Sequence, residues 1–324
     1  VFACKDYIRF RLTGKAGAEI TDYSGSGLMN LQSGEFDREL LKLFGIAEVW
    51  DALPPLCRAT EIFGAVTEEA AALCGLRPGT PVIGGMFDIN ACALAAGVTD
   101  PDRVCMIAGT WSINEYIRKA PVTDGSVLMN SLFCLPEYYL IEESSPTSAG
   151  NNEWFARELL PELRNVAEAE GRGIYEVLNE WVAEIAPTEF VPVFLPFLTA
   201  SNADPRARSA FLGLNASHSR KNMARAVYEG IAFSHRWHLE KLLASRGTRR
   251  GVIRLAGGAA RSPVWTQIFA DVMDMPVEAI AAAEAGADAH EHDAEPAQRD
   301  RLGLEHAVEA HEEQHGRQHG HDAF

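Results

Sequence analysis

Three short apolar stretches, each followed directly by glycine, constrain the fold of this chain most strongly. They lie at 81–85, 104–109 and 252–258, and each has the pattern of a buried strand that ends in a tight turn. Longer helical segments separate them, and the longest, 222–244, places its apolar residues near one face. Strands that alternate with helices predict an α/β fold.

Several helix ends are encoded by single residues. Thr67 can cap a helix over 68–74, and Gly75 can end it. Another short helix is predicted over 36–44, with Gly45 as its C-terminal stop. Local capping signals of this kind favour an ordered, well-patterned protein up to about residue 280.

The composition changes after residue 280. The segment 281–324 holds seven of the ten histidines, with 11 acidic and 3 basic residues, and few large apolar side chains. Such a segment cannot bury enough surface to offset its ordering entropy, so it is expected to be disordered. His311, His315 and His319 are spaced four apart and could hold a metal ion on a helix. A metal-binding protein is therefore an alternative, although the histidines fall outside the folded pattern.

Charge and hydropathy exclude several classes of protein. The net charge of −16 argues against a nucleic-acid-binding protein, which usually has a basic face. No run of eighteen apolar residues predicts a transmembrane helix, and the first residues lack the features of a signal peptide. The six cysteines have no CxxC spacing and indicate reduced, mostly buried thiols of a cytoplasmic protein, with no disulfide scaffold.

Asp88 is the first candidate for chemistry. It follows the glycine pair at 84–85 and lies between a predicted buried strand and a predicted helix over 90–96. In open α/β sheets, ligands bind at this edge, and a carboxylate there can accept a proton from an attacking hydroxyl. The simpler interpretation of the motif alone is that Asp88 caps the helix.

The second candidate is the pair Gly109 and Thr110. It lies between an apolar strand at 104–108 and a partner at 112–118 that alternates as a hairpin strand does. A P-loop is excluded, because its glycine-rich turn opens a helix. Such a hairpin can hold phosphate through backbone N–H groups and the threonine hydroxyl, although most Gly-Thr turns have no such function.

The third candidate is the turn that begins with Gly257 and Gly258 and continues to Arg261 and Ser262. A strand precedes it, and a helix that starts at Pro263 and runs to about residue 273 follows it. A strand, a glycine turn and a helix form a common nucleotide-binding arrangement. A single Gly-Gly turn of this kind is also frequent without any function.

The three turns, taken in order, resemble those of the FGGY family of carbohydrate kinases, in the actin-like ATPase superfamily. The resemblance extends over about residues 1–280. Its further segments are KDYIRFRLTG at 5–14, TDYS at 21–24, SAFLGL at 209–214 and AVYE at 226–229. It implies two actin-like, ribonuclease H-like lobes, with the end of the first domain at 1–100 and most of the second, nucleotide-binding domain at 101–280.

The resemblance also implies a role for each candidate residue. Asp88 would be the catalytic base on the sugar hydroxyl, and Gly109 with Thr110 would hold the β- and γ-phosphates of ATP. The adenosine would lie at Gly257 and Gly258, followed by Arg261 and Ser262. The cofactors implied are ATP and Mg²⁺, the partner is a sugar or polyol, and a homodimer is left open.

The subgroup is indicated by three further features. The segment 143–151, Phe87 before Asp88, and Trp111 after the Gly-Thr pair look most like those of L-xylulose kinases. The resemblance therefore implies a ketopentose such as L-xylulose as substrate, with Phe87 and Asp88 in contact with it.

Two departures from the family pattern leave an alternative open. The family's opening hairpin with its Asp-x-Gly-Thr loop is absent, so the chain is expected to begin partway into the first domain. Residues 284–287 begin like a helix of the family, and the sequence then departs from the pattern, through a change of reading frame or as a real segment. The alternative is a catalytically silent fragment that binds nucleotide or a partner without turnover.

Overall fold

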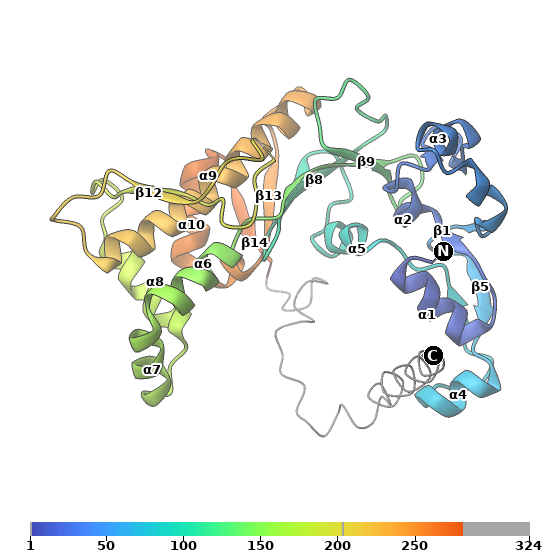
Figure 1. Cartoon of the computed structure of the whole chain (residues 1–324), viewed down its shortest axis with the longest axis horizontal. Helices are drawn as coiled ribbons and strands as arrows, with labels where there is room; N and C mark the ends of the chain where they lie inside the picture. Colours follow the sequence, from blue (N-terminus) through green and yellow to red (C-terminus); the bar gives the residue numbers. More distant parts are fainter. Residues whose placement is uncertain (1, 203, 281–324) are drawn as a thin grey trace, which may run out of the picture.

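The computed structural model describes residues 2–202 and 204–280 (Figure 1). The tail predicted to be disordered, 281–324, lies outside the described residues, and so do its spaced histidines. Within the described ranges, no helix has the length and apolar character needed to cross a membrane.

A six-stranded sheet forms the centre of the larger part of the structure (Figure 1). In the order in which they pair, its strands are β14 (Val277–Ala279), β13 (Val252–Gly257), β7 (Arg103–Ala108), β8 (Ser112–Arg118), β10 (Tyr139–Ser145) and β9 (Met129–Leu132). β13 runs parallel to β14 and β7, whereas each pairing from β7 to β9 is antiparallel. The hairpin predicted from 104–118 is therefore confirmed.

Both faces of this sheet are buried. Along β7, Val104 and Met106 belong to one core, whereas Cys105 and Ile107 belong to the other. Successive side chains of a strand point to opposite faces, so a strand covered on both sides needs apolar residues at every position. This explains why the segment at 104–108 is continuously apolar.

Helices cover the two faces of the sheet. On one face lie α9 (Arg220–Arg246) and α10 (Pro263–Met273), against which α8 (Ile174–Glu184) packs, and on the other lies α5 (Asp88–Ala95) (Figure 1). The long helix predicted over 222–244 is α9, and its Ile231 and Leu239 are fully buried.

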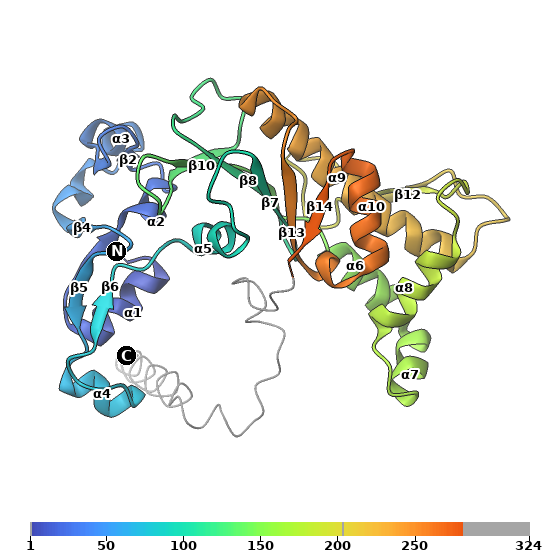
Figure 2. The same ribbon diagram turned by 180° about the vertical axis from the view of Figure 1, so that it is seen from behind.

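This lobe also has several shorter elements. They are α6 (Gly150–Trp154), a π-helical turn (Phe155–Leu159), α7 (Pro161–Ala169), β11 (Val193–Leu195) and β12 (Ala210–Leu212). Figure 2 shows α7 and α8 at the end of the structure that is far from α1 and α4.

Residues 2–83 form short elements beside this lobe (Figure 2). The helices are α1 (Cys4–Thr13), α2 (Ile20–Ser24), α3 (Arg38–Leu43), the 3₁₀ helix η1 (Ala47–Ala52) and α4 (Glu68–Cys74). The strands pair in twos: β1 (Ala18–Glu19) with β4 (Leu56–Cys57), β2 (Met29–Asn30) with β3 (Glu35–Phe36), and β5 (Ile62–Ala65) with β6 (Pro81–Ile83). The Leu132 N–H of β9 donates to the Ser24 hydroxyl of α2 at 2.8 Å and ties this part to the sheet.

The helix predicted over 68–74 is confirmed at both ends. The Thr67 hydroxyl accepts a hydrogen bond from Ala70 N at 3.2 Å, and Gly75 adopts a positive φ of 74°. The helix predicted over 36–44 is shorter, because Asp37 caps it by accepting from Glu39 N at 2.9 Å. Residues 36 and 37 of the predicted range therefore lie before the helix.

The prediction of a buried strand at 81–85 is wrong. β6 ends at Ile83, pairs only with β5 among the described residues, and leaves 49% of Ile83 exposed. Its apolar residues belong to a two-stranded ribbon outside the six-stranded sheet. Asp88 therefore does not follow a strand of that sheet, and its position has to be explained by other contacts.

The six cysteines are free thiols, as predicted. Cys57, Cys92 and Cys105 are buried, whereas Cys4 and Cys74 are exposed, so burial holds for only some of them. Burial raises the pKa of the Cys92 thiol to about 11, which keeps it protonated at neutral pH.

Candidate functional site

The Gly-Thr turn lies where β7 turns back into β8. Ala108 pairs with Ser112, so the three residues between them form the loop, and Thr110 is exposed at its tip. The Gly109 carbonyl accepts a hydrogen bond from Ala149 N at 2.8 Å. This bond holds the N-terminal end of α6 against the loop. We call this loop the phosphate hairpin (Gly109–Trp111), after the role that the family resemblance implies for it.

The Gly-Gly turn meets this hairpin directly. β13 runs beside β7, and Gly257 is paired with Ala108 (Figure 2). Gly257 has a φ of 84°, and a Cβ there would lie 2.7 Å from the Ala108 carbonyl oxygen. Only glycine fits this approach without strain. The structure thus brings together two predicted motifs that are almost 150 residues apart in the sequence.

The residues after this turn differ in accessibility. Gly258 and Arg261 are exposed and begin and end a 3₁₀ turn, whereas Ser262 is only 4% exposed. The Ser262 hydroxyl donates to Asn179 Oδ1 at 2.7 Å and accepts from Trp265 N at 3.2 Å. Ser262 therefore caps α10 and fixes the turn, while its predicted contact with ATP stays a prediction.

A pocket of about 400 Å³ adjoins the phosphate hairpin. Its walls include Thr110 and Trp111 of the hairpin, Gly150 and Trp154 of α6, and Thr199. The contribution of α6 and of Thr199 was missed at the sequence level. The available signal was the polar segment 143–151, which indicated only the subgroup.

Asp88 is the first residue of α5 and is exposed. The residue in the cap position is Phe87, which makes no side-chain cap hydrogen bond, so Asp88 is not the cap. Its Oδ1 accepts from Ile89 N at 2.8 Å. The N-terminal end of a helix stabilises a negative charge, and the exposed carboxylate is free to meet a ligand.

The loop before Asp88 is held by the N-terminal segments. Phe87 N donates to the Thr21 hydroxyl at 2.9 Å, and this hydroxyl donates to Glu19 Oε2 at 2.6 Å. The Arg9 guanidinium donates to the Gly84 carbonyl oxygen. The position of Asp88 is therefore set by the contacts of its loop with α1 and α2, and the preceding strand β6 does not anchor it to the six-stranded sheet.

Behind this loop lies a compact ion-pair network. The Lys5 ammonium lies 3.2 Å from Asp6, 3.4 Å from Glu19 and 3.1 Å from Asp22, and Asp6 lies 2.9 Å from Arg9. Burial raises the pKa of Glu19, while Thr21 and Lys5 act in the opposite direction. Apart from Glu19 of β1, these residues belong to the segments at 5–14 and 21–24, which gives those segments a role in holding the Asp88 loop.

Two buried carboxyl groups lie on the sheet face that α5 covers. Glu115 of β8 and Glu142 of β10 are cross-strand partners, with 0% and 4% of each residue exposed. Within the described part of the chain, neither Glu115 oxygen has a hydrogen-bond partner. Burial raises the pKa of both groups, and the Glu142 charge raises that of Glu115 further. The folded chain therefore keeps protons on this pair at a pH where the unfolded chain releases them.

We expect Glu115→Gln to stabilise the folded chain, and more strongly as the pH rises. A carboxyl group with a raised pKa binds more protons in the folded state, so the wild type loses stability above its ordinary value of 4.5. Glutamine keeps the shape and removes the ionisation, which should add about 1 kcal/mol or more at pH 8. Urea unfolding at pH 5 and pH 8 measures it. The exposed Glu168→Gln of α7 is the control, and a gain that does not grow with pH would contradict the assignment.

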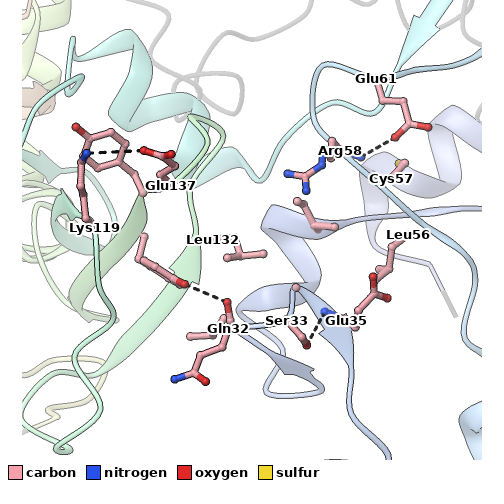
Figure 3. Close-up of a pocket in the computed structure, with 15 residues that line it drawn as sticks. Gln32, Ser33, Glu35, Leu56, Cys57, Arg58, Glu61, Lys119, Leu132 and Glu137 are labelled. Carbon is pink, nitrogen blue, oxygen red and sulfur yellow. Dashed lines mark hydrogen bonds and ion pairs between the residues drawn. The ribbon is translucent and has the colours of Figure 1, made fainter.

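A slightly larger pocket, of about 440 Å³, lies away from these motifs (Figure 3). Lys119 and Glu137 line one side, with 3.7 Å between their charged atoms, and Arg58 and Glu61 line the other. None of the predicted site residues takes part. We therefore take the two glycine turns, which meet at Gly257 and Ala108, as the candidate active site in preference to this larger pocket.

Models of both domains of the FGGY family of carbohydrate kinases match this chain. The N-terminal domain matches residues 1–95, and the C-terminal domain matches residues 104–287. The matches include Asp88 in the first domain and both glycine turns in the second.

Curated relatives show the same family. The L-xylulose/3-keto-L-gulonate kinase of Escherichia coli (strain K12) is 37% identical over 280 residues, which cover 86% of this chain and 54% of that protein. The probable L-xylulose kinase of Haemophilus influenzae is 37% identical over 275 residues, with coverages of 84% and 54%. The chain thus spans about half the length of the curated relatives it matches.

Solved structures confirm the predicted actin-like α/β fold. Xylulose kinase from Rhodospirillum rubrum has a TM-score of 0.71 at 32% identity, covering 84% of this chain and 54% of that chain. Ligand-bound xylulose kinase from Lactobacillus acidophilus has a TM-score of 0.75 at 23% identity, covers 94% of this chain and 58% of that chain, and shows the fold alone. The two domain matches and this common fold show that the chain belongs to the FGGY family of carbohydrate kinases.

Proposed function

We propose that this chain binds ATP between the phosphate hairpin and the Gly-Gly turn, and transfers the γ-phosphoryl group to a sugar hydroxyl. The observation that carries the proposal is the approach of Gly257 to Ala108, which joins the two turns into one glycine-lined surface. Glycine at both turns lets phosphates and adenosine approach the backbone closely.

Each part of ATP has proposed contacts on this surface. The backbone N–H groups of Gly109 and Thr110, with the exposed Thr110 hydroxyl, would hold the β- and γ-phosphates. The adenosine would lie over Gly257 and Gly258, with the exposed Arg261 near its edge. Ser262 would act through the turn that it caps.

Mg²⁺ is proposed to arrive with the triphosphate. Among residues 2–202 and 204–280, no group of three or more His, Cys, Asp or Glu side chains could hold a metal ion. Mg²⁺ commonly keeps several waters and binds through substrate phosphates with few carboxylates. An ion carried by ATP would therefore need no cluster of protein ligands here. When bound, it would offset the phosphate charge.

Asp88 is proposed to be the general base. It is exposed at the N-terminal end of α5. This helix covers one face of β7, the strand that leads into the phosphate hairpin. Its carboxylate would accept the proton of the attacking hydroxyl as the new bond to phosphorus forms. Phe87, whose N–H is fixed on Thr21, would contact the sugar beside it.

The proposed substrate is a ketopentose such as L-xylulose. This rests on the names of the relatives at 37% identity. A cytoplasmic location remains a prediction. A homodimer remains a prediction as well.

Coupled ADP release with ATP, Mg²⁺ and a panel of ketopentoses and polyols tests the proposal. We expect sugar-dependent ADP release, fastest with L-xylulose. The second candidate is a silent fragment that binds nucleotide without turnover, for which the glycine-lined surface alone would suffice. ATP binding without sugar-dependent release from any member of the panel would support it and contradict turnover by this chain.

A further inference from the structure

His235 lies at the centre of α9 and is fully buried among polar partners. Its Nδ1 lies 2.8 Å from Asn114 Oδ1, and its Nε2 lies 2.8 Å from the Ser148 hydroxyl. The Asn114 amide nitrogen donates to the Glu143 carbonyl at 3.1 Å, so Asn114 Oδ1 must be an acceptor. The network therefore assigns the proton to Nδ1 and leaves Nε2 to accept from Ser148.

These partners belong to the two segments that hold the phosphate hairpin. Ser112, whose hydroxyl lies 3.2 Å from His235 Nδ1, is the first residue of β8 after the hairpin. Ser148 immediately precedes Ala149, whose N–H donates to the Gly109 carbonyl at 2.8 Å. One imidazole thus joins the strand that leaves the hairpin to the segment that docks on it.

The imidazole works by geometry and carries no charge. Burial lowers its pKa to about 3, with a smaller effect from the neighbouring His238. A neutral ring with one donor and one acceptor has a single way to satisfy Asn114 and Ser148 together. Buried networks with all partners satisfied hold their members rigidly.

We propose that His235 is a positioning residue that fixes the phosphate hairpin for the β- and γ-phosphates of ATP. This inference rests on the proposed nucleotide site. A histidine whose role was only to fill the core would not need hydrogen-bond partners in the segments on both sides of the hairpin. Loss of its hydrogen bonds should therefore weaken the recognition of phosphate and leave the recognition of adenosine intact.

The test compares the affinities of ATP and AMP for the whole chain by calorimetry. His235→Leu keeps most of the volume and leaves Asn114 and Ser148 without their partner. We expect ATP to bind about tenfold more weakly, which is the effect of one or two lost hydrogen bonds. AMP affinity should stay within about twofold, because AMP lacks the β- and γ-phosphates. His235→Gln, which can still donate and accept, should recover part of the loss.

His238→Leu is the matched control. His238 lies on the same helix and is 2% exposed, but its partner is Glu143, at 3.0 Å, and not the hairpin. It should lower stability while leaving the ratio of ATP to AMP affinity unchanged. If His235→Leu does not fold, Ser148→Ala removes one bond of the same bridge and should lower that ratio about threefold.

Three results would overturn the inference. They are an equal loss of ATP and AMP affinity in His235→Leu, an unchanged ratio in Ser148→Ala, and the same shift in the His238→Leu control. A wild-type chain that binds AMP as tightly as ATP would remove the proposed phosphate contacts themselves. A preference for ATP over AMP that is undiminished in His235→Leu would instead contradict only the role of His235.

Discussion

Asp88→Asn is expected to lower kcat by about two to four orders of magnitude, the usual contribution of a general base. Asparagine keeps the size and the hydrogen bond from Ile89 N but cannot take up a proton. In the proposed site this carboxylate does not contact ATP, so the affinity for ATP should change by less than about twofold. The coupled assay at saturating sugar gives kcat, and calorimetry gives the ATP affinity.

The matched control is Asp271→Asn, an exposed carboxylate on α10 in the part of the chain that matches the C-terminal domain of the family. It should leave both quantities unchanged. A near-normal kcat in Asp88→Asn would remove Asp88 from the role of base. A large loss of ATP affinity would mean that the carboxylate acts in nucleotide binding.

Gly257→Val is expected to abolish ATP binding and to destabilise the chain by about 2 to 4 kcal/mol. A Cβ at this position would lie 2.7 Å from the Ala108 carbonyl oxygen, and the φ of 84° disfavours a branched side chain. Relief requires β13 to move away from the hairpin, which separates the two halves of the site. Urea unfolding with and without ATP measures both effects, because a ligand stabilises only a state that binds it.

Gly258→Ala separates the fold from the site. A Cβ there has no neighbour nearer than 3.9 Å, so the free energy of unfolding should change by less than about 0.5 kcal/mol. The added methyl group would enter the surface proposed for adenosine and should weaken ATP. Normal ATP affinity in both glycine variants would place the nucleotide elsewhere.

Sequence predicted best where one residue decides a boundary. Thr67 and Gly75 each set one end of α4 through their own hydrogen bond and φ, and Pro263 begins α10. The strand at 104–108 was also predictable, because burial on both faces demands apolar residues throughout. In these cases the cause lies within a few residues of its effect.

The sequence was less informative where contacts between distant segments determine the structure. The segment at 81–85 is as apolar as a core strand, but in the part of the chain that the structure describes it pairs only with β5, so its pattern could not reveal its exposure. The meeting of Gly257 and Ala108 depends on which strands pair, which local sequence does not specify. The bridge made by His235 has no local sequence signal, because its partners lie about 90 and 120 residues before it.

The most direct test of the central claim follows the γ-phosphoryl group itself. The unmodified chain is incubated with Mg²⁺, L-xylulose and ATP labelled at the γ-phosphate, and the sugar fraction is analysed for label. We predict label in a sugar phosphate, in amounts equal to the ADP formed, and none without sugar. Bound ATP with no label transferred to L-xylulose or to any other sugar of the panel would contradict phosphoryl transfer by this chain.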